Sequence, residues 1–400
     1  MKKMLSLAAM FAVLAYASPA SAELKIGGDA SMRIRGQFEN YEFDGDTYDG
    51  SDTDNDLNFA YRLRLKAAAD LGSGYFVKAL LTTDSSTNEF GLRAGGWNTV
   101  GAGNNEEATI DISQLYFGRM MENSHWMVGR LPLNSLNNPI FDLALYPIPF
   151  DANSLSPFPF TSFGYPVAPA GIADGAVATY NMDRVYGINY GCKIGSGEAN
   201  ATLVVFDNNS RDDSTAEGDG FFNDGYALHL SYKDKLGDVT IEPQAIISLT
   251  NLNGAVYSGV SPLTFGANLS FPAGTAKIGM SAFYTTCDDN GYDNRFGGMP
   301  VDVDYSGYLL RLKGEVGNFT AWIDYNRTTS KTYSFVEATY ENLFVWAQYN
   351  FKVYESAAGS FSLTPTVRYW AAGADFDFSG DKLETSYSRL RTELVATVTF

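Results

Sequence analysis

The residues best suited to chemistry are basic side chains near the two ends of the chain. They fall on alternate positions of short segments: Arg33, Arg35, Arg62, Arg64, Lys66, Lys78, Arg368, Arg389 and Arg391. We call this set the basic stripe. Like charges placed side by side cost free energy unless something compensates them, and a row of Arg and Lys side chains attracts anions. The alternative is structural, because acidic residues on the same face would form ion pairs with part of the stripe. These are Asp29, Asp70, Glu315 and Glu393.

Catalytic chemistry has few candidate residues. The chain has 2 His, His125 and His229, and a Ser-His hydrolase needs a histidine beside its nucleophile. No G-x-S-x-G segment accompanies either of them. The 2 Cys, Cys192 and Cys287, form no C-x-x-C pair. We therefore expect no enzyme activity, no cofactor and no metal centre.

Acidic residues gather in polar segments. One segment supplies oxygen ligands of the kind that Ca²⁺ prefers, without the glycine and closing glutamate of an EF-hand: Asp44, Asp46, Asp49, Asp52, Asp54 and Asp56. A solvated acidic loop is the simpler interpretation. The alternative is that such loops, including 211–224 and 288–293, share divalent cations with the phosphates of lipopolysaccharide.

Overall charge excludes one class of partner, and the N-terminus indicates export. Lys+Arg is 28 and Asp+Glu is 46, a formal net charge of -18, so the chain lacks the basic balance that binds nucleic acid. Residues 1–22 combine Lys2 and Lys3, an apolar run and the small residues Ala20-Ser21-Ala22. That pattern is typical of a signal peptide. We expect cleavage after Ala22.

The elements that must position these side chains are strands. From Leu24 onward, apolar and polar residues alternate in segments separated by turn residues, and a period of two is typical of β-structure. We count about sixteen strands, an even number that places both ends of the chain on one side of a barrel. The last four are expected at 318–329, 343–353, 360–373 and 387–400.

Two features favour a membrane barrel over a soluble sheet, which also alternates. The connections alternate between short turns, such as Gly317-Asn318, and long polar loops. Outward aromatic residues lie beside the short turns, as at a membrane interface: Tyr75, Tyr232, Phe271, Phe319, Tyr349, Phe351 and Phe361. We therefore expect an all-β transmembrane antiparallel β-barrel with its apolar face in outer-membrane lipid.

This layout resembles that of the trimeric porins of Gram-negative outer membranes. The resemblance covers residues 23–400 and includes a long segment after the fifth strand, 131–175, preceded by the step Gly129-Arg130. It implies an outer-membrane location, a lumen filled with water, and a homotrimer. It also implies a third loop that folds into the lumen.

The 131–175 segment holds more than half of the 14 prolines and many aromatic residues, and the aromatics argue against disorder. An irregular loop of this length is usually functional. We expect it to form a constriction with these residues: Asp142, Tyr146, Phe150, Asp151, Phe158 and Phe160. An external lid or a trimer contact is the alternative. The acidic motif common at the tip of this loop in the family is missing.

The C-terminal strand carries a further resemblance. Its lipid-facing residues look like the assembly signal that the barrel insertion machinery reads in this family: Leu394, Ala396, Val398 and Phe400. Simple packing against lipid is the alternative.

Together these features predict a porin for passive diffusion of small hydrophilic solutes and ions, with a preference for anions set by the basic stripe. The alternative is a substrate-specific channel in which loop aromatics bind sugars or other ligands. An outer-membrane barrel enzyme is a distant third.

Overall fold

The computed structural model describes residues 23–43, 46–48, 57–83, 97–99, 110–133, 137–141, 184–207, 225–250, 262–292, 301–333, 336–378 and 381–400. Within this part of the chain, no helix is long and apolar enough to cross a membrane. The strands are β1 (Glu23–Phe43), β2 (Asp46–Tyr48), β3 (Leu57–Gly72), β4 (Tyr75–Thr83), β5 (Asn98–Thr99), β6 (Ile110–Met120), β7 (Ser124–Pro132), β8 (Arg184–Ile194), β9 (Gly197–Asp207), β10 (Gly225–Leu236), β11 (Val239–Ser248), β12 (Leu263–Ala273), β13 (Ala276–Tyr292), β14 (Val301–Val316), β15 (Phe319–Tyr333), β16 (Val336–Tyr349), β17 (Phe351–Ser356), β18 (Gly359–Phe378) and β19 (Asp381–Thr399).

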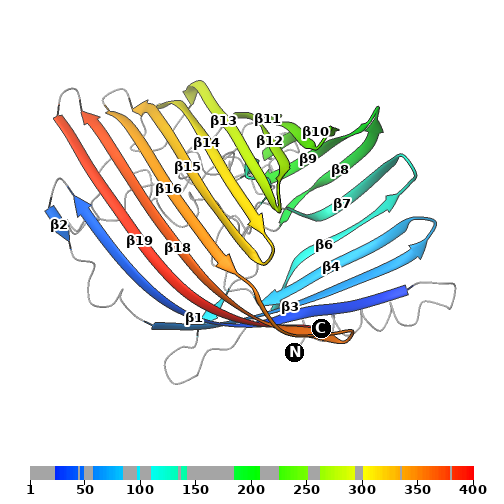
Figure 1. The fold of residues 1–400 in the computed structure, drawn as a ribbon. Helices are drawn as coiled ribbons and strands as arrows, with labels where there is room; N and C mark the ends of the chain where they lie inside the picture. The colour runs from blue at the N-terminus through cyan, green and yellow to red at the C-terminus, as the bar shows by residue number, and fades with distance from the viewer. Residues whose placement is uncertain are drawn as a thin grey trace, which may run out of the picture.

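The strands form one antiparallel sheet that closes on itself. Each strand of the wall pairs with its neighbours in sequence, and β1 pairs with both β3 and β19. The blue and red ends of the chain therefore lie side by side (Figure 1). The short strands β2 and β5 add to the edges of β1 and β3, and β16 and β17 both pair with β18. The result is a closed barrel of 16 strands, as the alternation predicts.

Exposure follows the predicted period of two. On β1, Met32 is 69% exposed on the outer face, whereas its neighbour Arg33 is 5% exposed on the inner face. The same outer face carries Leu394 and Phe400 of the adjoining end of the chain, which are 43% and 50% exposed. An apolar outer face and a polar inner face are the arrangement of a barrel that spans a membrane and encloses a lumen.

Tight turns join the strands at the end of the barrel where the chain begins and ends. Gly237 and Gly274 both have φ of 63°, a conformation that glycine adopts at no steric cost, and it suits the tight hairpins between β10 and β11 and between β12 and β13. Exposed aromatic residues of the predicted girdle lie beside these turns, with Tyr75 and Phe319 each 41% exposed. The predicted short connections are confirmed.

The opposite end differs from the prediction in one respect. Strands were expected to stop at 329 and 373, but β15 continues to Tyr333 and β18 to Phe378. The hairpins β15–β16 and β18–β19 therefore extend well past the expected strand ends. The prediction of a long loop between the two strands of each hairpin is wrong. Aromatic side chains stabilise the extension, because Tyr340 and Phe376 pack edge to face with ring centroids 6.0 Å apart.

Several expectations fall outside the described residues. These are the signal peptide at 1–22, the acidic segments 49–56 and 211–224, and the predicted constriction residues Asp142, Tyr146, Phe150, Asp151, Phe158 and Phe160.

Candidate functional site

The inner face of the barrel where β18, β19 and β1 adjoin carries a cluster of three guanidiniums around one carboxylate. The Glu393 side chain on β19 has no solvent exposure. Its carboxylate accepts a hydrogen bond from Arg35 Nε at 2.5 Å, and Arg368 Nη2 and Arg33 Nη1 lie 2.7 and 3.7 Å from its oxygens. The register brings these groups together, because Arg35 pairs directly with Glu393 across the β1–β19 seam. We call these four residues the Glu393 cluster.

Tryptophan rings contact several guanidiniums of the basic stripe. Arg33 and Arg62 both lie over the ring of Trp97, 4.3 and 4.7 Å from its centroid. Arg368 lies 3.7 Å from the centroid of Trp346. Such cation–π stacking fixes the plane of a guanidinium while its N–H groups remain at the edge. The stacking therefore orients the basic side chains along the wall.

Other members of the basic stripe have different surroundings. Arg64 Nη2 lies 2.9 Å from Asp29, Arg391 donates a hydrogen bond to Gln37, and Arg389 lies 4.7 Å from the Trp370 ring centroid. Lys66 is exposed, and exposed Lys78 lies 5.0 Å from the Phe76 ring centroid. The structure thus brings the arginines together near the seam and leaves the two lysines along β3 and β4.

Two of the four acidic residues named in the structural alternative lie against the stripe. Asp29 and Glu393 form ion pairs with stripe residues. The other two make their contacts elsewhere. Asp70 accepts a hydrogen bond from the backbone N–H of Gly72 in the turn after β3, because it lies at the strand end. Glu315 pairs with Lys313 on β14, in another part of the wall.

The opposite wall holds the short segment Asn137–Phe141 of the long connection after β7. Ile140 and Phe141 are 0% and 3% exposed, and the Phe141 ring packs edge to face on His229, with centroids 5.1 Å apart. They belong to a cluster of buried side chains on the inner wall: Tyr116, Leu131, Val185, Val204, Ala227, Ile246, Phe283 and Leu309. This part of the 131–175 segment therefore lies inside the barrel.

An amide clasp fixes the same segment by hydrogen bonds. Asn138 Nδ2 donates to Gln244 Oε1 at 2.8 Å, and Gln244 Nε2 donates back to Asn138 Oδ1 at 3.0 Å. Asn268 Nδ2 also donates to Asn138 Oδ1, at 3.1 Å. Next to it, Lys313 Nζ donates to Asn137 Oδ1 at 2.7 Å. The polar contacts thus join the segment to β11, β12 and β14.

The Gly129-Arg130 step precedes this segment and has a structural role. Gly129 has φ of 126°, and a Cβ there would lie 2.3 Å from the backbone oxygen of Leu115. Arg130 donates a hydrogen bond to the Ile112 carbonyl and lies 4.8 Å from the Tyr186 ring centroid. The step therefore packs the end of β7 closely against β6.

The C-terminal residues lie on the outer face as predicted. Leu394 and Val398 are 43% and 47% exposed, and Ala396 shares their face by the alternation of β19. Phe400 exchanges two backbone hydrogen bonds with Gly28 of β1, of 2.8 and 3.1 Å. A Cβ on Gly28 would lie 3.1 Å from the Phe400 ring, so glycine leaves room for the aromatic side chain at the seam.

The histidines make ordinary wall contacts. His229 Nε2 lies 2.8 Å from Gln244 Oε1, and His125 Nε2 lies 3.0 Å from Asn189 Oδ1. Both cysteines are free thiols. Among the residues that the structure describes, no group of three or more His, Cys, Asp or Glu side chains could hold a metal ion.

Sequence reasoning missed the tryptophans and a second group of inward basic residues. Trp97 lies in a polar stretch with no periodic signal, and only its contact with the stripe shows its position. Arg311 and Lys313 lie on the inner face of β14, where each is buried. Alternation alone could have placed these two, whereas their partners Asp324 and Asn137 depend on the folded arrangement.

Comparison with known proteins agrees with this architecture. A family model described as Gram-negative porin matches residues 7–352. The outer-membrane channel DcaP of Acinetobacter baumannii is 15% identical, with a TM-score of 0.54, over 96% of this chain and 99% of that one. An anion-selective porin from Comamonas acidovorans is 13% identical, with a TM-score of 0.48, over 95% and 100% of the two chains. No curated protein sequence matches the chain. The family match covers most of the chain, and we conclude that it belongs to the Gram-negative porins and forms a channel in the outer membrane.

Proposed function

We propose that this porin lets small hydrophilic solutes and ions diffuse through a water-filled lumen and that it prefers anions. The observation that supports anion preference is the Glu393 cluster, where the described residues comprise three guanidiniums and a single carboxylate. Basic side chains along a pore wall raise the local concentration of anions and lower that of cations.

The test is the reversal potential of the purified protein in a planar bilayer under a KCl gradient. We expect its sign to correspond to a higher permeability for Cl⁻ than for K⁺. A potential of the opposite sign would show that the basic stripe has only a structural role in the barrel wall and does not set ion selectivity.

We also propose that the whole 131–175 segment narrows the lumen. The support is the inward position of Asn137–Phe141, which anchors one part of that segment on the inner wall. The proposed constriction would then face the basic stripe across the lumen, since β10–β12 lie about half-way round the strand order from the β19–β1 seam.

Loss of the amide clasp is expected to loosen this segment. Asn138→Ala removes three hydrogen bonds, so the buried amides of Gln244 and Asn268 each lose the partner that Asn138 provides. Each such loss costs about 1 kcal/mol or more. The current through single open channels should therefore become noisier. Asn342→Ala is the matched control, because it removes a buried amide that bonds Asn326 and Trp370 away from the segment. Equal noise in both variants would contradict the anchoring role.

Four further proposals concern export and assembly. Residues 1–22 act as a signal peptide, so the purified protein should begin at Glu23. The exposed apolar outer face contacts outer-membrane lipid and lipopolysaccharide. Three copies form a homotrimer, as the resemblance to trimeric porins implies. The insertion machinery reads the C-terminal residues Leu394, Ala396, Val398 and Phe400.

Deletion of Phe400 tests the assembly role. It removes both backbone hydrogen bonds to Gly28 and the ring that covers this glycine. The C-terminal end of the seam therefore loses its contacts with β1. We expect the amount of folded barrel in the outer membrane to fall severalfold. Phe271→Ala is the control, because it removes an aromatic side chain beside a short turn on β12. If both changes lower the folded amount equally, Phe400 contributes packing alone.

A further inference from the structure

A polar pocket lies beside the anchored segment, on the wall opposite the basic stripe. It has a volume of about 270 Å³, many times the volume that one water needs. Its lining comes from β10 to β14 and from Asn137. Asn137 is part of the 131–175 segment, so this segment forms part of the pocket wall.

The charges that line the pocket leave one ammonium in excess. Arg311 is bound by Asp324 through two hydrogen bonds, of 2.5 and 2.9 Å, and Lys313 lies 2.5 Å from Glu315. Two ammonium groups, Lys233 and Lys277, and the carboxylate of Glu242 are then left on the lining. Their sum is one positive charge, which matches a ligand that carries one negative charge.

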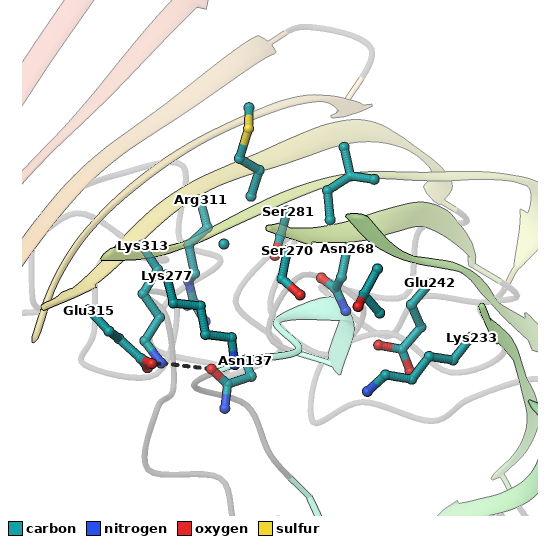
Figure 2. A pocket seen from close by; sticks show the side chains of 14 residues that line it. Asn137, Lys233, Glu242, Asn268, Ser270, Lys277, Ser281, Arg311, Lys313 and Glu315 are labelled. Carbon is teal, nitrogen blue, oxygen red and sulfur yellow. Dashed lines mark hydrogen bonds and ion pairs between the residues drawn. The ribbon is translucent and has the colours of Figure 1, made fainter. Parts of the chain in front are cut away.

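The two lysines lie at different sides of the pocket. Figure 2 shows Lys277 directed toward Asn137 at one side and Lys233 beside Glu242 at the other. Both lysines are exposed, and neither makes a hydrogen bond or an ion pair of 4.0 Å or less with another described residue. Each can therefore donate to a ligand without losing such a partner.

Neutral hydrogen-bonding groups occupy the space between the lysines. Ser270, Ser281 and Asn268 lie there (Figure 2), and together they supply hydroxyl and amide groups that both donate and accept. Such a surface suits the hydroxyl groups of a solute better than an apolar tail, because each buried hydroxyl needs a partner. The pocket volume of about 270 Å³ is large enough for more than a simple ion.

We propose that this pocket binds a small carboxylate solute that bears several hydroxyl groups, the chemistry of a sugar acid. Its carboxylate accepts hydrogen bonds from Lys277 or Lys233, and its hydroxyls bond Ser270, Ser281 and Asn268. The site rests on the proposed channel function, because a solute must enter the lumen to reach it. It lies on β10–β14, apart from the basic stripe, which lies on β18, β19, β1, β3 and β4.

The experiment measures block of the KCl current in planar bilayers by potassium gluconate, with two partial ligands for comparison. Potassium acetate carries the charge alone, and sorbitol carries the hydroxyls alone. We expect gluconate to block at a concentration at least tenfold lower than either, because charge-assisted and neutral hydrogen bonds then act together. Equal potency of gluconate and acetate would overturn the proposal.

Two variants separate the charged and neutral parts of the site. Lys233→Gln with Lys277→Gln should raise the half-blocking concentration of gluconate at least tenfold. Ser270→Ala with Ser281→Ala should weaken gluconate severalfold and leave acetate unchanged. The matched control is Lys331→Gln with Lys352→Gln, since both side chains are 58% exposed outside the pocket. An effect of the control as large as that of the lysine variant would overturn the proposal.

The same membranes distinguish failure of this site from failure of the channel function. The reversal potential in KCl is recorded before gluconate is added. A channel that prefers Cl⁻ but shows no block by gluconate overturns the pocket and leaves anion preference in place, whereas a channel that prefers K⁺ contradicts the proposed function itself.

Discussion

Changing Arg33, Arg62 and Arg64 together to Gln is expected to lower the permeability ratio of Cl⁻ to K⁺ by roughly tenfold or more. A unit charge about 8 Å from an ion in water contributes about 0.5 kcal/mol, so three charges contribute about 1.5 kcal/mol, which is roughly a factor of ten for each ion and acts in opposite directions on Cl⁻ and K⁺. Loss of Arg64 also leaves Asp29 without its ion pair, which adds to the shift. The measurement is the reversal potential under a gradient of dilute KCl, where screening is weak.

A triple control carries the same change of charge on exposed side chains: Arg327→Gln, Lys331→Gln and Lys352→Gln. The side chains of all three residues are 47% to 58% exposed, and each forms an ion pair at the surface. Surface pairs of this kind contribute little to stability. The control should keep the selectivity of the wild type. A triple change in the stripe that leaves the reversal potential unaltered would assign those arginines to wall structure.

Glu393→Gln is expected to lower the free energy of unfolding by about 3–5 kcal/mol, the range for a buried charge that loses its partner. The carboxylate has no exposure and contacts three guanidiniums, so the neutral amide leaves Arg33, Arg35 and Arg368 facing one another. Urea unfolding of the barrel in detergent micelles, followed by tryptophan fluorescence, measures the loss.

Two comparisons test the cause. Glu355→Gln removes the partner of Lys352 in an exposed pair, so we expect a loss of about 1 kcal/mol or less. Adding Arg35→Gln to Glu393→Gln removes one of the crowded guanidiniums and should recover part of the stability. If the double variant is less stable than Glu393→Gln, repulsion among the arginines is not the reason for the loss.

Alternation in the sequence was sufficient to predict the barrel wall. On β1 the exposed Ile26, Met32 and Ile34 and the buried Asp29 and Arg33 fall where a period of two places them. Membrane barrels make this signal reliable, because lipid and lumen demand opposite polarity on successive residues. The positions of the tight turns follow from the same pattern, since glycine marks the residues with positive φ.

The contacts within the lumen could not be predicted in the same way. Arg35 and Glu393 are far apart in the chain and meet only because the first and last wall strands pair in a particular register. Trp97 lies under Arg33 through the folding of a polar connection that has no periodicity. The amide clasp of Asn138 likewise depends on where the segment enters the barrel. Such contacts are set by closure and loop path, which local sequence does not encode.

The seam between β1 and β19 has a consequence for folding. Most other contacts between neighbouring wall strands join elements close in sequence, and such hairpins close with a small loss of chain entropy. The pairing of Asp29 with Thr399 joins residues at opposite ends of the chain, so the sequence separation between paired strands is largest at this seam. The sheet can grow by local steps, but its two edges remain open to pairing with other chains until the seam forms. Closure of the seam is thus the step at which a sheet prone to aggregation becomes a barrel without edges.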